Sequence, residues 1–154
     1  MKIKLEVFWA KCRDCETNFE VFAGTQLYGT RILRSQNTCK HAVVVCDSDP
    51  AFDEVGELVD NLLEYKNVPP YKKTEIFNQV FSEICDPAPD GNNYDMRGRI
   101  WCPKCHKSNV SYGPNEPPQS REVDLDEVTH KKWNSLQPNQ KVQRIKELLS
   151  QLEV

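Results

Sequence analysis

A long hydrophobic segment is the first feature that this 154-residue sequence lacks. Its longest uninterrupted apolar run covers residues 42–46, whereas a membrane-spanning helix needs about 20 apolar residues. The N-terminal residues alternate between charged and apolar side chains, in contrast to the continuous apolar block of a secretory signal. We therefore expect a cytoplasmic protein with no membrane anchor.

Motifs of the common enzyme classes are also missing. The sequence has no glycine-rich phosphate loop, no HExxH metalloprotease motif and no GxSxG nucleophile motif. A zinc deaminase would have an upstream His-x-Glu and a proline directly before Cys102, and neither is present. These absences favour a protein without enzymatic activity.

Cysteine, in contrast, is abundant, with seven residues. An odd number leaves one thiol unpaired in a disulfide scaffold, and no feature marks the chain as secreted. Four cysteines form two CxxC pairs, Cys12/Cys15 and Cys102/Cys105. A two-residue gap lets a tight turn direct both thiolates at one ion, and two such turns complete a tetrahedral shell of four thiolates. We predict that these four residues hold one structural Zn2+ ion.

The long separation of the two pairs is compatible with a single site. Residues 16–101 lie between them, far more than the 15–20 or so residues of compact zinc motifs. Closing that loop costs roughly 4 kcal/mol, whereas structural zinc contributes about 10–16 kcal/mol to folding. Two alternatives are unrelated reduced thiols and a thioredoxin-type dithiol, but the latter would place one CxxC at the start of a helix.

Two hairpins that each present a CxxC turn resemble the zinc-ribbon, or rubredoxin-like, fold. Glu16 and His106 stand where this family usually has glycine, and only the second CxxC pair contains the family's proline, Pro103. These departures weaken an iron-binding electron carrier more than they weaken a zinc protein. The resemblance covers the two CxxC hairpins, implies a fold and a bound metal, and leaves the function open.

Cys39, Cys46 and Cys85 remain outside the two pairs, with His41 close to the first. We expect them to pack as small apolar side chains, because cysteine is among the most buried residue types. The alternatives are a second metal site that joins all four residues, and a nucleophilic pair of Cys39 and His41. Of the other histidines, we expect His106 to be exposed beside Cys105, where it could replace a ligand, and His130 to lie on a solvated helix face.

Apolar periodicity predicts strands around both CxxC pairs. Residues 1–23 should form a hairpin whose turn carries Cys12 and Cys15, with Ile3, Leu5, Val7 and Trp9 on one half-buried face. Residues 42–46 should form a buried strand. Residues 99–101 and 108–112 should form a second hairpin around the second pair.

Two amphipathic helices are predicted between these strands. Ser48-Asp49-Pro50 supplies an N-cap and a first-turn proline for a helix that extends to about residue 65. A second helix begins near Tyr71 and ends before Asp86-Pro87. We expect these helices, about 47–86, to be an antiparallel pair inserted into a split zinc-ribbon domain of residues 1–113.

The C-terminal segment is predicted to be separate from that domain. Residues 114–123 contain three prolines, which predicts a linker. Asp124 and Glu127 resemble a capping box for a short helix, and a final helix follows Pro138, so residues 124–154 should form a helical hairpin. The predicted class is therefore α+β: zinc-ribbon-like antiparallel hairpins, an inserted helical pair and a C-terminal helical hairpin.

Charge is unevenly distributed along the chain. Residues 47–66 carry seven acidic side chains and one lysine, which suits either a solvated face or contact with a basic partner. Residues 97–112 contain four basic side chains and no acid. These cations, together with Trp101 and Tyr112, could hold nucleic acid, or they could offset the negative charge of a zinc ion bound by four thiolates. The candidate nucleic-acid-binding residues are Arg97, Arg99, Lys104 and Lys107.

These patterns favour a non-enzymatic, zinc-stabilised adaptor that binds another protein. The alternative is a nucleic-acid-binding zinc ribbon that uses its basic knuckle surface. A rubredoxin-like iron electron carrier and a thiol enzyme are the weaker alternatives.

Overall fold

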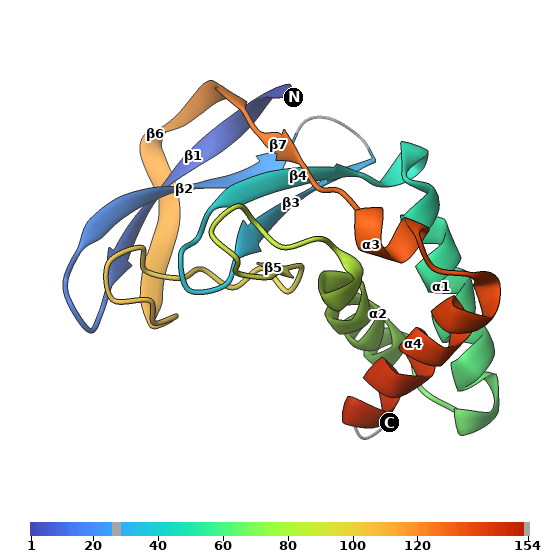
Figure 1. The fold of residues 1–154 in the computed structure, drawn as a ribbon. Helices are drawn as coiled ribbons and strands as arrows, with labels where there is room; N and C mark the ends of the chain where they lie inside the picture. Colours follow the sequence, from blue (N-terminus) through green and yellow to red (C-terminus); the bar gives the residue numbers. More distant parts are fainter. Residues whose placement is uncertain (26–28, 153–154) are drawn as a thin grey trace.

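The computed structural model describes residues 1–25 and 29–152 and has a mixed α+β architecture, which confirms the predicted class (Figure 1). The strands are β1 (Lys2–Cys12), β2 (Asn18–Thr25), β3 (Thr30–Ser35), β4 (His41–Val45), β5 (Tyr94–Asp95), β6 (Val110–Asp124) and β7 (Asp126–Glu127). The helices are α1 (Pro50–Leu63), α2 (Pro70–Ile84), α3 (Lys131–Asn134) and α4 (Pro138–Gln151), with short 3-10 turns at Cys46–Ser48 and Glu64–Lys66.

The first sheet, sheet A, has the strand order β2-β1-β6 and is antiparallel throughout. The predicted N-terminal hairpin is confirmed: Lys11 of β1 faces Asn18 of β2, and the first CxxC pair lies in the turn between the two strands. Cys12 is the last residue of β1, so the register of the hairpin fixes the position of this turn. The central strand of sheet A therefore leads directly into the cysteine site.

Burial along β1 changes from one face to the other at Phe8. Ile3, Leu5 and Val7 are buried in the first half, whereas Ala10 and Cys12 are buried in the second half. Trp9 continues the alternation of the first set but is 45% exposed, so the burial of this face ends at Val7. Different parts of the molecule cover the two halves of the twisted strand. The alternation of apolar residues alone does not predict where the buried face changes.

The predicted linker over residues 114–123 is instead part of the long strand β6. The partner of Val7 is Gln119 and the partner of Phe8 is Pro114, so residues 115–118 bulge out of the ladder. Pro117 and Pro118 lie within this bulge. Proline is tolerated at bulges and on edge strands such as β6, because its missing N–H is not needed for pairing.

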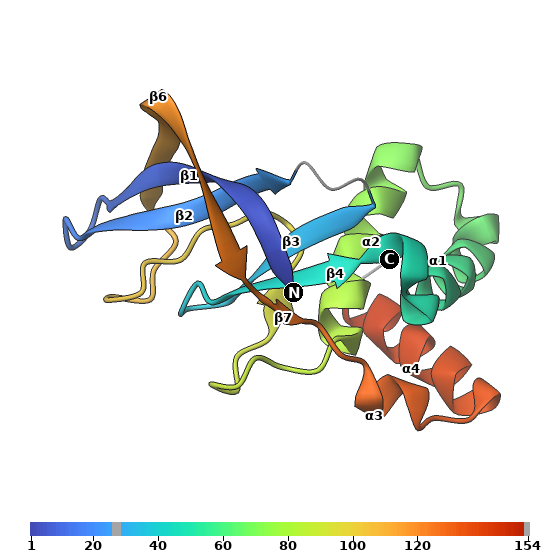
Figure 2. The ribbon, with the colours of Figure 1, turned by 90° about the horizontal axis from the view of Figure 1, so that it is seen from above.

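The second predicted hairpin is also wrong in one half. Residues 99–101 are not a strand, and β6 pairs with β1 instead of pairing with them. Because β1 and β6 are neighbours, the second CxxC pair, which directly precedes β6, returns to the end of β1 (Figure 2). The pairing of β1 with β6 is thus what brings distant cysteines together.

The second sheet, sheet B, has the order β5-β3-β4-β7, and β7 runs parallel to β4. The expected strand at 42–46 is confirmed as β4, one residue shifted. The predicted C-terminal helical hairpin is wrong in its first half, because Asp124 ends β6, Asp126–Glu127 form β7, and α3 has only four residues. Asp124 caps no helix, and its carboxylate accepts a hydrogen bond from the N-terminal amine at 2.9 Å.

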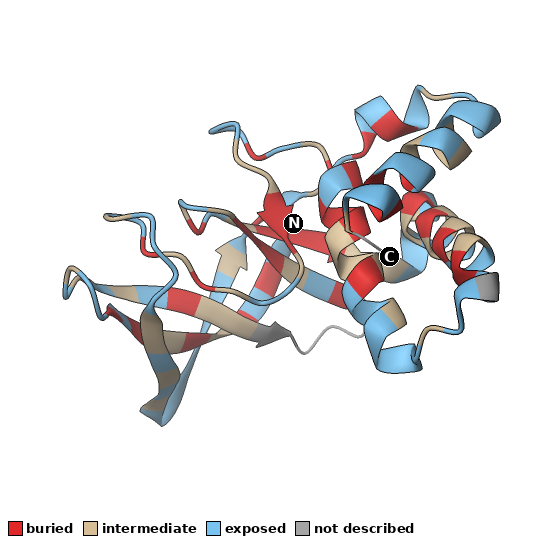
Figure 3. Ribbon diagram, turned by 90° about the horizontal axis from the view of Figure 1, so that it is seen from below, coloured by how far each residue is buried: buried red, intermediate tan, exposed pale blue. Residues whose placement is uncertain are grey.

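The main core lies between sheet B and the helices. Both predicted helices are confirmed as α1 and α2, and the carboxylate of Asp49 caps α1 by accepting the Ala51 N–H at 3.0 Å. The C-terminal helix α4 packs against both of them, and buried residues gather where these elements face one another (Figure 3). This core includes Leu33, Ala42, Val44, Val55, Val59, Ile76, Phe81, Trp133, Ile145 and Leu148.

None of the helices in the described parts of the chain has the length and apolar content needed to cross a bilayer.

Candidate metal centre

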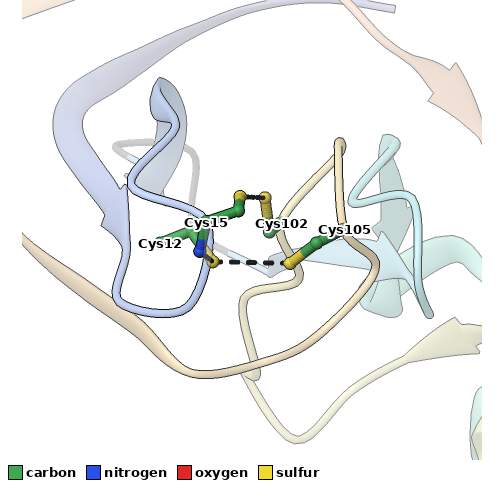
Figure 4. Close-up of side chains that lie close together, drawn as sticks. All are labelled: Cys12, Cys15, Cys102 and Cys105. Atoms are coloured by element: carbon green, nitrogen blue, oxygen red, sulfur yellow. Dashed lines mark hydrogen bonds between the residues drawn. The ribbon is translucent and has the colours of Figure 1, made fainter.

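The four predicted cysteine ligands converge at one end of sheet A (Figure 4). The Sγ atoms of Cys12 and Cys105 are 3.4 Å apart, those of Cys15 and Cys102 are 3.6 Å apart, and all four lie within 4.8 Å of one another. A tetrahedral zinc with Zn–S distances of about 2.3 Å separates its sulfurs by about 3.8 Å. All four cysteines are free thiols, so their spacing and chemistry fit a metal ion such as Zn2+.

The first knuckle is held in shape by its own backbone. The Cys12 amide donates to the Thr17 carbonyl at 3.0 Å, and the Glu16 amide donates to the Cys12 carbonyl at 3.0 Å. Glu16 has φ 61°, the left-handed conformation that usually favours glycine. The turn directs the Cys15 amide toward the Cys12 Sγ at 3.5 Å.

The second knuckle repeats this backbone pattern. The Cys102 amide donates to the Lys107 carbonyl at 2.8 Å, and the His106 amide donates to the Cys102 carbonyl at 2.9 Å. His106 has φ 65°, so both positions at which glycine was expected are left-handed. The His106 side chain is exposed, as predicted, and its Nδ1 lies 2.8 Å from the Asn37 carbonyl in the loop between β3 and β4. This contact ties the second knuckle to sheet B.

The four thiols differ in exposure and in proton affinity. Cys12 and Cys102 are fully buried, whereas Cys15 and Cys105 are half-buried. Hydrogen bonds from the hydroxyl and backbone of Thr17 lower the pKa of Cys15 to about 6. A hydrogen bond from the Lys107 backbone favours the Cys105 thiolate, but burial and the three neighbouring sulfurs raise its pKa to about 12. Binding of a cation at neutral pH therefore displaces a proton from this cluster.

The remaining three cysteines do not converge. Cys46 and Cys85 belong to the main core, whereas Cys39 packs with Ala10, Val21 and Ile100 beneath sheet A. Across residues 1–25 and 29–152, the four knuckle cysteines are the one group of Cys, His, Asp or Glu side chains placed to share an ion. The alternative of a second site from these residues and His41 therefore has no geometric support in the described structure.

Cys39 and His41 are not arranged as a nucleophile and its base. The His41 Nε2 accepts hydrogen bonds from the Phe22 amide at 3.2 Å and from the Arg34 Nε–H at 3.3 Å. Burial, together with the charge of Arg34, lowers the pKa of His41 to about 4, and burial raises the pKa of Cys39. The base nitrogen is thus occupied by two donors, and the thiol is held in its protonated form.

The four predicted nucleic-acid-binding residues lie within the second knuckle and in the segment before it. Lys104 and Lys107 are exposed on the knuckle itself. Arg97 and Arg99 precede it, and both donate their Nε–H to the buried carboxylate of Asp95. Asp95 was not identified from the sequence, although the spacing Asp-x-Arg-x-Arg is visible there.

A second buried polar pair was also missed. His130 is buried and not on a solvated helix face, and its Nε2 lies 2.7 Å from a carboxylate oxygen of Asp49. The prediction failed because residues 124–130 contain no helix, and His130 packs against Phe81 in the core. Asp49 thus joins the start of α1 to the segment that leads into α3.

Comparison with protein-family models, with curated proteins and with solved structures finds no match to this chain. No similarity to a known protein therefore bears on its function.

Proposed function

We propose that the chain is a non-enzymatic, zinc-stabilised protein whose role is to bind another protein, with the metal holding the binding surface rigid. The four thiolates would occupy all positions of a tetrahedral Zn2+ ion, and a closed shell leaves no position for a reacting water. Two knuckles with the same backbone hydrogen bonds support a zinc-ribbon-like centre. The seven free thiols support a reducing, cytoplasmic location.

The exposed indole of Trp9 is the observation that carries the binding role. Its ring lies over Gly113 of the neighbouring strand, where a Cβ atom would lie only 3.1–3.3 Å from three ring atoms. The ring thus covers the sheet with one face while the residue remains 45% exposed. Trp is enriched among the residues that dominate protein–protein binding energies. Trp9 is only three residues from Cys12, so the metal centre would fix its position.

The surroundings of Trp9 indicate the chemistry of the partner. Lys11 is exposed two residues further along the same strand face, and Arg13 lies beyond it. The acid opposite Trp9, Glu20, is paired with both terminal nitrogens of Arg121 at 3.0 and 3.2 Å. A partner with an apolar pocket and an acidic rim would complement this face.

Chemical cross-linking in the native host, followed by capture of the tagged chain, tests this role. We expect a defined protein to be captured with the parent chain, lost with Trp9→Ala and retained with Tyr71→Ala. Tyr71 is a matched control, because it is a large aromatic residue, 72% exposed, at the start of α2. Equal capture by all three chains, at equal metal content, would exclude Trp9 as the anchor.

The metal itself is tested by elemental analysis of protein grown without added zinc. About one zinc per chain is expected. Visible absorption from bound iron would instead favour the rubredoxin-like electron carrier.

Binding of nucleic acid is a second candidate function, favoured by a specific observation. The exposed side chains of Arg97, Lys104 and Lys107, with the half-buried Arg99, flank the second knuckle in a segment without acidic residues. Cations in this arrangement suit contacts with phosphates. Retention on immobilised nucleic acid that falls steeply with salt is the expected result, and no retention at low ionic strength would eliminate this candidate.

A further inference from the structure

Asp95 is a buried carboxylate that two arginines share. Its Oδ1 accepts the Arg97 amide at 2.7 Å and the Arg97 Nε–H at 3.4 Å, while its Oδ2 accepts the Arg99 Nε–H at 2.6 Å. The carboxylate lies in β5, which pairs with β3, so the sheet fixes its position. Asp95 therefore sets the direction of both arginine side chains from the protein interior.

Both guanidinium groups are held by one edge only. Each contact to Asp95 uses Nε, so the terminal nitrogens of Arg97 and Arg99 make no hydrogen bond to this carboxylate. The Arg97 side chain is 38% exposed, and Arg99 is similarly exposed. Arg99 is held a second time, because its guanidinium lies 5.0 Å from the ring centre of Trp101. The result is a pair of arginines that are fixed at Nε and whose side chains are more than one third exposed.

The local charge is positive despite the buried acid. Arg34, which is buried, is the cross-strand neighbour of Asp95 and adds a third cation. Glu83 lines a small cavity with Arg97, but within the described parts of the chain neither Arg97 nor Arg99 is ion-paired to any acid other than Asp95. Two carboxylates thus offset part of the charge of three arginines, and Arg97 and Arg99 are the exposed members of the three.

We propose that Asp95 is a positioning residue that holds Arg97 and Arg99 as a preformed cradle for a phosphodiester group of a nucleic-acid strand. This inference rests on the second candidate function and assigns its phosphate contact. The planar fork of arginine matches the oxygens of a phosphate, and a fork that is already oriented loses less entropy on binding. Lys104 and Lys107 continue the positive surface along the knuckle and would meet the next phosphates.

The test measures binding of a fluorescently labelled 12-nucleotide single strand to the metal-loaded full chain at several salt concentrations. Asp95→Asn separates the cradle from simple charge attraction, because it makes the protein one unit more positive. Charge attraction alone would tighten binding. Loss of the preformed cradle should instead weaken it by at least about 5-fold and reduce its salt dependence.

The double variant Arg97→Gln/Arg99→Gln removes the proposed phosphate-binding groups themselves. The slope of log Kd against log salt should fall by about 1.4, since each of the two arginines that meet a phosphate of a single strand contributes about 0.7. Arg144→Gln is the matched control, because Arg144 is an arginine of the same exposure on α4. It should change the salt slope by much less than the double variant.

Metal content and circular dichroism report whether each variant folds. If Asp95→Asn loses its metal, Arg97→Lys/Arg99→Lys takes its place, since it keeps both charges and removes the forks, and at least about 3-fold weaker binding is expected. Equal or tighter binding by a folded Asp95→Asn or Lys variant would overturn the cradle while leaving nucleic-acid binding intact. No binding by the parent chain would eliminate the second candidate function itself. Binding of a phosphopeptide but not of the oligonucleotide would overturn the assigned ligand.

Discussion

The Nε2 atom of His41 accepts the Nε–H of Arg34 at 3.3 Å on sheet B, and the same nitrogen accepts the Phe22 amide of sheet A. Arg34 also donates from Nη2 to the Phe22 carbonyl at 2.7 Å. An imidazole nitrogen that accepts two N–H donors carries no proton, so the neutral form of His41 with its proton on Nδ1 joins the two sheets. Protonation of Nε2 would break both hydrogen bonds.

The stability of the protein should therefore fall in mild acid. Burial and the charge of Arg34 lower the pKa of His41 from 6.5 to about 4, so the unfolded chain binds this proton more readily than the folded chain does. The contribution of neutral His41 is complete above about pH 6.5, declines as the pH falls from there, and is lost below about pH 4. Urea unfolding of the zinc-saturated protein at several pH values measures this decline.

His41→Gln separates this effect from protonation of the cysteines. Glutamine is uncharged at every pH, so the difference in unfolding free energy between the parent chain and the variant should shrink between about pH 6.5 and 4. A difference that stays constant over that range would exclude His41 as the source.

Replacement of a ligand and replacement of a core cysteine should have different consequences. Cys102→Ser removes one of four sulfurs from the cluster and should abolish tight metal binding, with a large loss of thermal stability. Cys46→Ala should keep the metal and cost about 1–2 kcal/mol, because it removes only a half-buried side chain packed on the main core. Metal analysis and thermal melts of both variants test this, and equal melting temperatures of Cys102→Ser and the parent would contradict it.

Glu16→Gly should stabilise the first knuckle. Glu16 has φ 61°, a conformation that costs a non-glycine residue about 1–2 kcal/mol and costs glycine little. The greater freedom of glycine in the unfolded chain offsets part of this gain, so we expect a net increase of up to about 1 kcal/mol. His106→Gly relieves the same strain but removes the side chain that meets Asn37, so it should gain less. Chemical unfolding of the metal-bound variants is the measurement, and a destabilised Glu16→Gly would refute the prediction.

The buried pair of Asp49 and His130 should contribute strongly to the stability of the protein. Asp49→Ala removes the cap of α1 and leaves the buried His130 without its partner, at a combined cost of about 2–4 kcal/mol. Asp49→Asn keeps the oxygen that caps α1 but replaces the oxygen opposite the imidazole with an NH2 group, so it should cost less than Asp49→Ala. Similar destabilisation of the two variants in urea would show that the capping oxygen does not carry the effect.

The elements that follow from local sequence were predicted well. The Asp49 cap, the first-turn proline and the apolar spacing define α1, and the break at Pro69-Pro70 separates it from α2. The N-terminal hairpin and β4 follow from alternation of apolar residues. The four cysteines were predicted as one cluster. The two-residue gap within each CxxC pair is a local feature that marks both pairs as metal-binding turns, although the pairs are far apart in sequence.

Elements that depend on a distant partner were predicted poorly. The proline content of residues 114–123 indicates a linker, but this segment pairs with the open edge of β1 as strand β6. The same applies to Leu125, which is buried against Ile3 and Val43 and not within a helix. Whether a segment pairs with the edge of a sheet depends on which strand has an unpaired edge in the folded molecule. The sequence of that segment alone does not show this.

The sequence by itself determined the two CxxC pairs of the four-cysteine cluster, the class of fold and the two central helices, because each rests on residue types at short fixed spacings. Only the tertiary structure decided that Trp9 is exposed, that His41 is held between two sheets, and that Asp95 directs two arginines. Each of these depends on what packs around the residue in the folded chain, and the local sequence pattern does not determine that packing.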